Sequence, residues 1–75
     1  PDLIKLDRSL IQGIGNDPGR RALAAALTVF ARDTGSKLIA EGVETEGELA
    51  MLRALGVDTV QGYLLGRPQP IADVQ

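Results

Sequence analysis

The 75-residue chain has no cysteine and no histidine, and its only aromatic residues are one phenylalanine and one tyrosine. The missing cysteine excludes a disulfide framework, a thiolate nucleophile and a zinc-finger site, and it leaves the redox compartment undetermined. Without histidine, general acid or base chemistry must fall to carboxylates or lysine. A chain of this size makes one small domain at most, or a piece of a larger one, because it buries too little surface for a strong core.

Charge and apolar runs exclude two further classes of partner. Eight Lys plus Arg against ten Asp plus Glu give a net charge of −2, which is no basic footprint for DNA or RNA. The longest nearly uninterrupted apolar stretch, residues 22–31, is far shorter than the roughly 20 residues that a membrane span requires. We therefore expect neither a nucleic-acid partner nor a membrane-spanning segment in this chain. Because the chain opens with Pro1 and Asp2 instead of methionine, we expect a fragment.

Three short apolar runs are predicted to be β-strands, at residues 3–6, 37–40 and 57–60. Helical spacing lies between them, and strand–helix alternation builds a parallel sheet through crossover connections. The predicted fold class is therefore α/β. Two helices cannot cover both faces of a three-stranded parallel sheet, so we expect the covering elements or further strands to lie elsewhere. The stretch 64–75 is expected to be an irregular exit with one further turn.

The helix boundaries are marked by short-range signals. Asp17 is suited to cap the first helix, Pro18 to begin it, and Gly35 to close it after residue 34. A capping box of Thr45 and Glu48 predicts a second helix at residues 46–55. Four apolar residues share one face of the first helix: Leu23, Ala26, Leu27 and Phe30. The arginines on the helices are interpreted as solvated: Arg20, Arg21, Arg32 and Arg53.

A polar residue lies at or near the C-terminal end of each apolar run: Lys5, Glu41 and Gln61. The C-terminal ends of parallel strands share one rim, where adjacent strands are about 4.8 Å apart. Glycine directly follows Glu41 and Gln61, as expected where the backbone turns sharply or a ligand approaches. Because α/β folds place their sites at this rim, we expect the three side chains to converge there.

Each acidic or basic candidate also has a structural explanation. Lys5 is compatible with a strand-end lysine whose ammonium stays in water. An unpaired Glu41 would be costly after an apolar run, so a partner or a metal would explain it. Glu46 and Glu48 favour the positive end of the second helix, whereas Glu44 is left open between this role and a site role. Asp7 is expected to cap a short turn at residues 8–10.

The motifs IKLDRSLI and LIAEGVETEGELAMLRALGVDTVQGYLLGRPQP, with the helix between them, resemble the C-terminal part of EAL domains. EAL domains are phosphodiesterases that hydrolyse cyclic di-GMP. Three motifs occur in family order: KLD with Lys5, AEGVET with Glu41, and QGY with Gln61. The resemblance implies a TIM-like barrel in which residues 1–75 supply strands six to eight and the intervening helices, and thus no complete domain. It also implies a cytoplasmic protein.

The resemblance further implies two divalent cations, Mg²⁺ or Mn²⁺, at the C-terminal rim. These hard ions prefer oxygen ligands, which fits a chain without histidine or cysteine. Glu41 would be a metal ligand or the general base, and Lys5 would help to orient the attacking water. Gln61 and Glu44 would support the site or the substrate. Two bound metals would activate water and clamp the phosphodiester for in-line displacement.

Several family motifs are absent from these 75 residues: the Glu-Ala-Leu tripeptide, the metal-binding asparagine with its following glutamate, and the Asp-Asp-Phe-Gly-Thr-Gly loop. A full barrel has roughly 250 residues, so we expect this chain to be inactive alone. Its open first strand should lead to self-association or to pairing with the missing part of the barrel. The alternative function is a catalytically degenerate EAL-like module that binds cyclic di-GMP or a protein partner.

Overall fold

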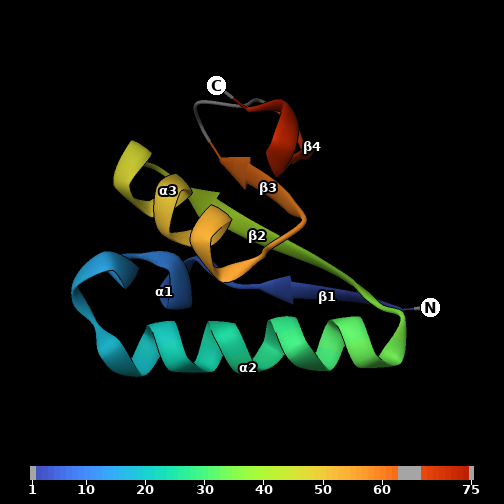
Figure 1. Ribbon diagram of the computed structural model, residues 1–75. Helices are drawn as coiled ribbons and strands as arrows, with labels where there is room; N and C mark the ends of the chain where they lie inside the picture. Colours follow the sequence, from blue (N-terminus) through green and yellow to red (C-terminus); the bar gives the residue numbers. More distant parts are fainter. Residues whose placement is uncertain (1, 63–66, 75) are drawn as a thin grey trace.

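The computed structural model describes residues 2–62 and 67–74, which form one four-stranded sheet in the order β1-β2-β3-β4 (Figure 1). The strands are β1 (Leu3–Leu6), β2 (Lys37–Val43), β3 (Thr59–Gly62) and β4 (Gln69–Pro70). The first three strands are parallel, as the sequence predicts, and β4 runs antiparallel to β3. The stretch predicted as an irregular exit therefore adds an edge strand. Residues 63–66, which include Tyr63 of the QGY motif, lie outside the described part of the chain.

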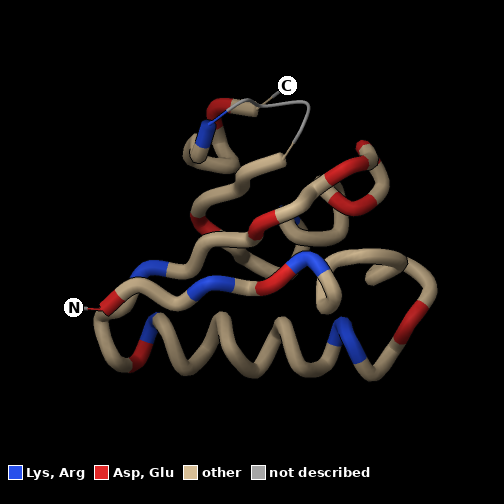
Figure 2. The backbone as a smooth tube through the Cα atoms, turned by 180° about the vertical axis from the view of Figure 1, so that it is seen from behind, with Lys and Arg blue, Asp and Glu red and all other residues tan. Residues whose placement is uncertain are grey.

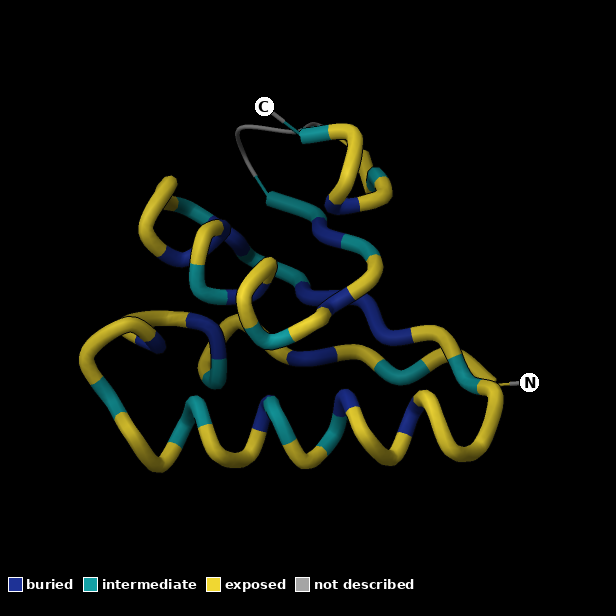
Figure 3. Tube along the Cα trace, in the orientation of Figure 1, coloured by how far each residue is buried: buried dark blue, intermediate teal, exposed yellow. Residues whose placement is uncertain are grey.

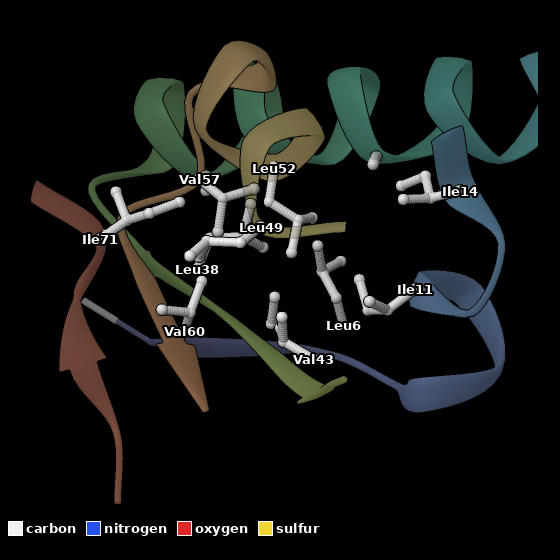
Figure 4. Packing of buried hydrophobic residues seen from close by; sticks show 13 residues of the cluster. Leu6, Ile11, Ile14, Leu38, Val43, Leu49, Leu52, Val57, Val60 and Ile71 are labelled. Atoms are coloured by element: carbon white, nitrogen blue, oxygen red, sulfur yellow. The ribbon is translucent and has the colours of Figure 1, made fainter. Parts of the chain in front are cut away.

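Two longer helices, α2 (Pro18–Thr34) and α3 (Glu46–Leu55), make the crossovers between the parallel strands. Three short helical turns accompany them: α1 (Arg8–Ile11), η1 (Ile14–Asn16) and η2 (Ile71–Asp73). Figure 4 shows α2 and α3 on the same side of the sheet, with the buried side chains between them and the strands. The other face of the sheet carries neither helix. No helix in the described ranges is long and apolar enough to cross a membrane.

Local hydrogen bonds explain where the helices begin. The Asp17 carboxylate accepts hydrogen bonds from the N–H groups of Gly19 and Arg20, which confirms it as the cap of α2. The Thr45 hydroxyl accepts one from the Glu48 N–H, 3.0 Å away, at the start of α3. In a capping box, the Glu48 carboxylate would accept a hydrogen bond from the N–H of the cap residue Thr45. In the structure it accepts one from the N–H of the preceding residue, Glu44, at 2.8 Å.

The core lies between the helices and one face of the sheet (Figure 4). Alternate strand residues point into it because successive side chains of a strand face opposite sides. Several of its side chains are almost completely inaccessible to solvent: Leu6, Ile11, Ile14, Leu38, Leu52, Val57 and Val60. The core thus lies on the face of the sheet that the helices cover, and the polar strand residues lie on the other face.

The four-residue apolar stripe of α2 is only partly buried, with Leu27 packed against the core. Ala24, Thr28 and Ala31 are buried, and their small volumes let the helix approach the sheet closely. Leu23 and Phe30 remain 51% and 56% exposed. Figure 3 shows the corresponding alternation along α2, with buried positions toward the strands and exposed positions outside. We call the exposed residues Leu23, Ala26 and Phe30 the α2 flank.

Three helical arginines are not simply solvated, contrary to the expectation from sequence. Arg20 donates to the carbonyl of Gln12 at 2.6 Å, and Arg21 donates to the carbonyl of Gly15 at 2.9 Å. Both guanidinium groups therefore satisfy carbonyls of the loop before α2. Arg53 donates to two carbonyls of the C-terminal turn. Sequence periodicity marks such residues as surface positions but cannot reveal which loop folds back on them.

Candidate functional site

The site candidates Lys5, Glu41 and Gln61 lie near the C-terminal ends of three adjacent parallel strands. Two strand boundaries differ from the predicted ones, since β2 continues to residue 43 and β3 begins and ends two residues later than expected. Glu41 and Gln61 therefore lie within their strands. The reason is that strand pairing, which sequence periodicity does not show, extends beyond the apolar runs.

The register brings these three side chains to the same face of the sheet. Each of them is next in sequence to a core residue, and these core residues form one row across the strands: Leu6, Ala40 and Val60. Because side chains alternate along a strand, Lys5, Glu41 and Gln61 point to the opposite, helix-free face. Glu41 and Gln61 each follow a residue of the Ala40–Val60 pair, at the point where the register of β2 and β3 shifts. The structure therefore brings Lys5 close to Glu41 and places Gln61 on the adjacent strand.

Lys5 and Glu41 face each other across β1 and β2. The Lys5 Nζ atom and the Glu41 Oε2 atom are 3.9 Å apart, and the two side chains are 58% and 36% exposed. This separation exceeds that of a direct hydrogen bond. An exposed ion pair at this distance contributes little to folding stability. Stabilisation of the fold therefore does not explain why these two residues face each other. Both groups remain available to a ligand at this rim.

Glu44, the fourth candidate, is engaged in a different contact. Its Oε2 atom lies 2.8 Å from Nη2 of Arg8, the first residue of α1. Its backbone N–H donates to the Glu48 carboxylate. Glu44 thus belongs to the loop that follows β2 and does not join the row formed by the other three. Sequence reasoning missed Arg8, because no spacing signal links it to a partner so far along the chain.

Asp7 has the structural role that its position predicts. Its carboxylate accepts hydrogen bonds from the hydroxyl of Ser9 at 2.7 Å and from the Ser9 N–H at 3.0 Å. These two hydrogen bonds lower the pKa of Asp7 below its usual value of 3.8, and the bond from the Ser9 hydroxyl has the larger effect. Asp7 caps α1 and so fixes the position of Arg8, which follows it directly.

The described residues offer a metal ion only part of a site. The chain has no cysteine or histidine, and residues 2–62 and 67–74 contain no group of three or more carboxylates that could hold a metal ion. Asp7, Glu44 and Glu48 are occupied by the hydrogen bonds and the ion pair described above, which leaves Glu41 as the carboxylate available at the rim. Hard divalent cations require several oxygen ligands, so a metal here would need the others from outside these residues.

Charge is distributed unevenly around this rim. Figure 2 shows a basic residue in β1 and both signs directly after it, whereas the end of β2 and the first turn of α3 carry acidic residues. The sequence agrees, because Lys5, Asp7 and Arg8 follow one another closely while Glu41 and Glu44 precede two further glutamates. Lysine and arginine from the β1 side therefore face carboxylates from the β2 side.

The EAL domain family model matches residues 1–68 of the chain. MucR of Pseudomonas aeruginosa, a bifunctional diguanylate cyclase/cyclic di-GMP phosphodiesterase, is 40% identical over 67 residues, which cover 89% of this chain and 10% of that protein. The solved complex of the PaMucR phosphodiesterase with c-di-GMP has a TM-score of 0.79 and 39% identity, covering 92% of this chain and 28% of that one.

Another similar structure is that of BlrP1 of Klebsiella pneumoniae in complex with manganese and cyclic di-GMP, with a TM-score of 0.85 and 35% identity. That match covers 95% of this chain and 18% of the BlrP1 chain. The chain therefore spans between a tenth and less than a third of the length of the chains it matches here.

Proposed function

Since the chain belongs to the EAL domain family, we propose that it is the C-terminal part of a phosphodiesterase domain that hydrolyses cyclic di-GMP to the linear dinucleotide. Its fold is that of a partial TIM-like barrel, like the EAL structures it resembles. The observation that carries the proposal is the shared face of Lys5, Glu41 and Gln61 at the C-terminal ends of three parallel strands. In barrels of this class, that end of the strands is where catalytic residues lie.

Each residue of this row has a proposed role. Glu41 is the metal ligand or the general base, because its side chain is 36% exposed and its ion pair within the described residues is the 3.9 Å approach of Lys5. Lys5 orients the attacking water, since its ammonium lies on the same face and can donate three hydrogen bonds. Gln61 supports the site or the substrate from the neighbouring strand, and Glu44 supports it from the following loop.

The proposed metals are Mg²⁺ or Mn²⁺. The support is chemical: Glu41 is a hard oxygen ligand, and one similar structure contains manganese with cyclic di-GMP. When bound, two such ions would lower the pKa of a water molecule and neutralise charge on the phosphodiester. The described residues fit this role incompletely, because they hold no group of three or more candidate ligands and Glu41 is paired with Lys5 at 3.9 Å. We propose that the other ligands come from the part of the barrel that precedes this chain.

Residues 1–75 then correspond to strands six to eight of the barrel with the helices between them. The open edge of β1 would pair with the preceding strand, and the α2 flank would pack against the preceding helix. Without that part of the barrel, we expect a second copy of the chain to cover the same surface, so that the isolated chain self-associates. We also propose that the whole domain acts in the cytoplasm, as the family implies.

The test is a chimera in which this chain replaces the matching segment of the PaMucR phosphodiesterase domain. We expect it to hydrolyse cyclic di-GMP with Mn²⁺, and we expect Glu41→Gln to lower kcat by about 10²- to 10⁴-fold, as for loss of a general base. Glu46→Gln is the matched control, since Glu46 is an exposed carboxylate in the first turn of α3. It should leave kcat unchanged.

Three outcomes distinguish the functional alternatives. A folded chimera that binds cyclic di-GMP without hydrolysing it would favour the degenerate binding module. A folded chimera that does neither would refute the proposal. The 75-residue chain alone should give no linear product, because it lacks most of the metal ligands, and turnover by the chain alone would contradict that expectation.

A further inference from the structure

Strand β2 contains one extra residue between two of its pairings with β3. Ala40 is paired with Val60, whereas Val43 is paired with Gly62, so β2 uses three steps where β3 uses two. The irregularity is a β-bulge, in which an extra residue locally increases twist and redirects side chains. Gly42 lies within it at φ 77°, a left-handed conformation that favours glycine.

The bulge changes which side chains face the core. In a regular strand, Glu41 and Val43 would point to the same face, because they are two residues apart. In the structure, Val43 is only 2% exposed and lies in the core with Leu6 (Figure 4). Glu41 directly follows the core residue Ala40, so strand alternation directs it to the helix-free face. The extra residue therefore lets one short segment bury a valine and present a glutamate to the rim.

Two glycines allow other parts of the chain to pack closely against the bulge. A side chain at Gly62 would overlap the backbone of Val43, so β3 can approach β2 here only through glycine. On the other side, a Cβ atom at Gly42 would lie 2.6 Å from Cβ and 2.7 Å from Cγ of Arg8. The aliphatic stem of Arg8 therefore packs directly over the bulged residue, which keeps the side-chain position of Gly42 filled from α1.

The guanidinium group of Arg8 continues past the bulge to the next loop. Its Nη2 atom lies 2.8 Å from Glu44 Oε2, a charge-assisted hydrogen-bonding distance. Glu44 is also held through its N–H by Glu48, so the loop is fixed at both side chain and backbone. One arginine thus spans the bulge from Gly42 to Glu44, the residues on either side of Val43.

We propose that Arg8 is a positioning residue, whose stem over Gly42 and ion pair with Glu44 hold the β2 bulge so that Glu41 faces Lys5. The role depends on the proposed phosphodiesterase function of the rim, but the anchoring of Glu44 does not. Within the described ranges, the ion pair of Arg8 is with Glu44 and that of Lys5 is with Glu41, so Arg8 acts through the backbone between Gly42 and Glu44. In this proposal, Glu44 supports the site by binding the guanidinium group of Arg8.

The anchoring is tested on the chain itself with the variant Arg8→Met, which retains an unbranched stem but loses the guanidinium. Amide hydrogen exchange at Glu44 should become about two- to fivefold faster, as expected for loss of a partly exposed ion pair. Exchange at Leu38, in the same strand but distant from Arg8, should not change. Unchanged exchange at Glu44 would overturn the proposal, whatever the chimera does.

The positioning role is tested in the PaMucR chimera by separating kcat from KM. Arg8→Met should lower kcat about tenfold with little change in KM, because supporting contacts of this kind are typically worth 10- to 100-fold. Arg8→Lys keeps the stem and the charge and should recover most of the lost kcat. Arg32→Met is the matched control, since Arg32 is an exposed arginine on α2. It should leave kcat unchanged.

The results separate the two proposals. If the unmodified chimera is inactive, the proposed function fails, while amide exchange in the chain still decides whether Arg8 holds Glu44. If the chimera is active and Arg8→Met keeps kcat within about twofold of the unmodified chimera, the positioning role fails alone. A loss of kcat that Arg8→Lys does not recover would also overturn it.

Discussion

The two edges of the sheet end in different ways. At one edge, β1 pairs with β2 and with no other strand of residues 2–62 and 67–74. At the other, β3 pairs with the short antiparallel β4, which contains Pro70. Proline has no N–H to donate, and such residues discourage further pairing at an edge. Arg53 of α3 binds the carbonyls of Ile71 and Val74 and holds this segment in place. One edge is closed by the chain itself and the other is available to a partner.

The two sides of α2 also differ from each other. Thr28 of α2 lies close to Gly56 at the end of α3, whereas Leu23 and Phe30 lie on the other side of the helix. The buried side of α2 thus faces α3 and the core, and the exposed apolar side faces away from α3. The molecule has a core of its own on the α3 side and exposed apolar residues on the opposite side of α2, where the α2 flank lies.

The largest difference between the two sides should appear in a matched pair of leucine substitutions. Leu52→Ala removes a fully buried side chain and should lower the free energy of unfolding by about 2–5 kcal/mol. Leu23→Ala affects a side chain that is 51% exposed and should change it by less than about 0.5 kcal/mol at low protein concentration. Urea unfolding of both variants tests this, and similar losses would contradict the division into two sides.

The second prediction concerns the open side directly. Phe30→Lys places a charge in the α2 flank and should weaken self-association of the isolated chain about tenfold, since central aromatic side chains often dominate such interfaces. Val29→Lys is the matched control, because Val29 is similarly exposed, at 48%, but lies on another face of α2. Sedimentation velocity over a concentration series measures both. A monomeric unmodified chain would rule out self-association, and equal effects of the two variants would remove the flank from it.

The third prediction weakens the closed side. Arg53→Met retains the stem and removes the hydrogen bonds at 3.3 Å and 2.7 Å to the C-terminal turn. We expect a loss of about 1 kcal/mol in the free energy of unfolding, the usual contribution of such hydrogen bonds. Amide exchange at Ile71, whose N–H donates to the carbonyl of Asp58, should quicken as β4 loosens. If exchange there is unchanged, Arg53 does not hold the closed edge.

The smallest effect should come from acid at the cap of α1. Hydrogen bonds from Ser9 lower the pKa of the folded Asp7 carboxyl, so its stabilising contribution is complete above the unfolded value of 3.8. That contribution is lost as the pH falls through the lower, folded value. Asp7→Asn keeps an acceptor but does not titrate at this position. Stability measured against pH should therefore fall slightly more steeply below about pH 4 in the unmodified chain, and parallel curves would refute this.

Much of the architecture is predictable from short-range signals. Both long helices begin at the predicted caps, Asp17 and Thr45, and end where Gly35 and Gly56 follow them. These boundaries depend on hydrogen bonds within a few residues, which the local sequence determines. The parallel order of the first three strands and the approach of Lys5 to Glu41 were also predicted. The roles of the site residues remain predictions for the chimera to test.

Local spacing along the chain is enough to predict the strand–helix alternation, the helix ends and the polar residues at the C-terminal ends of the strands. Tertiary packing selects which face of α2 is buried, how β2 bulges at Gly42, and that Arg8 reaches Glu44. It also decided that β4 and Arg53 close one edge of the sheet while β1 stays open. Each of these features depends on contacts between residues far apart in the chain, for which spacing along the sequence carries no signal.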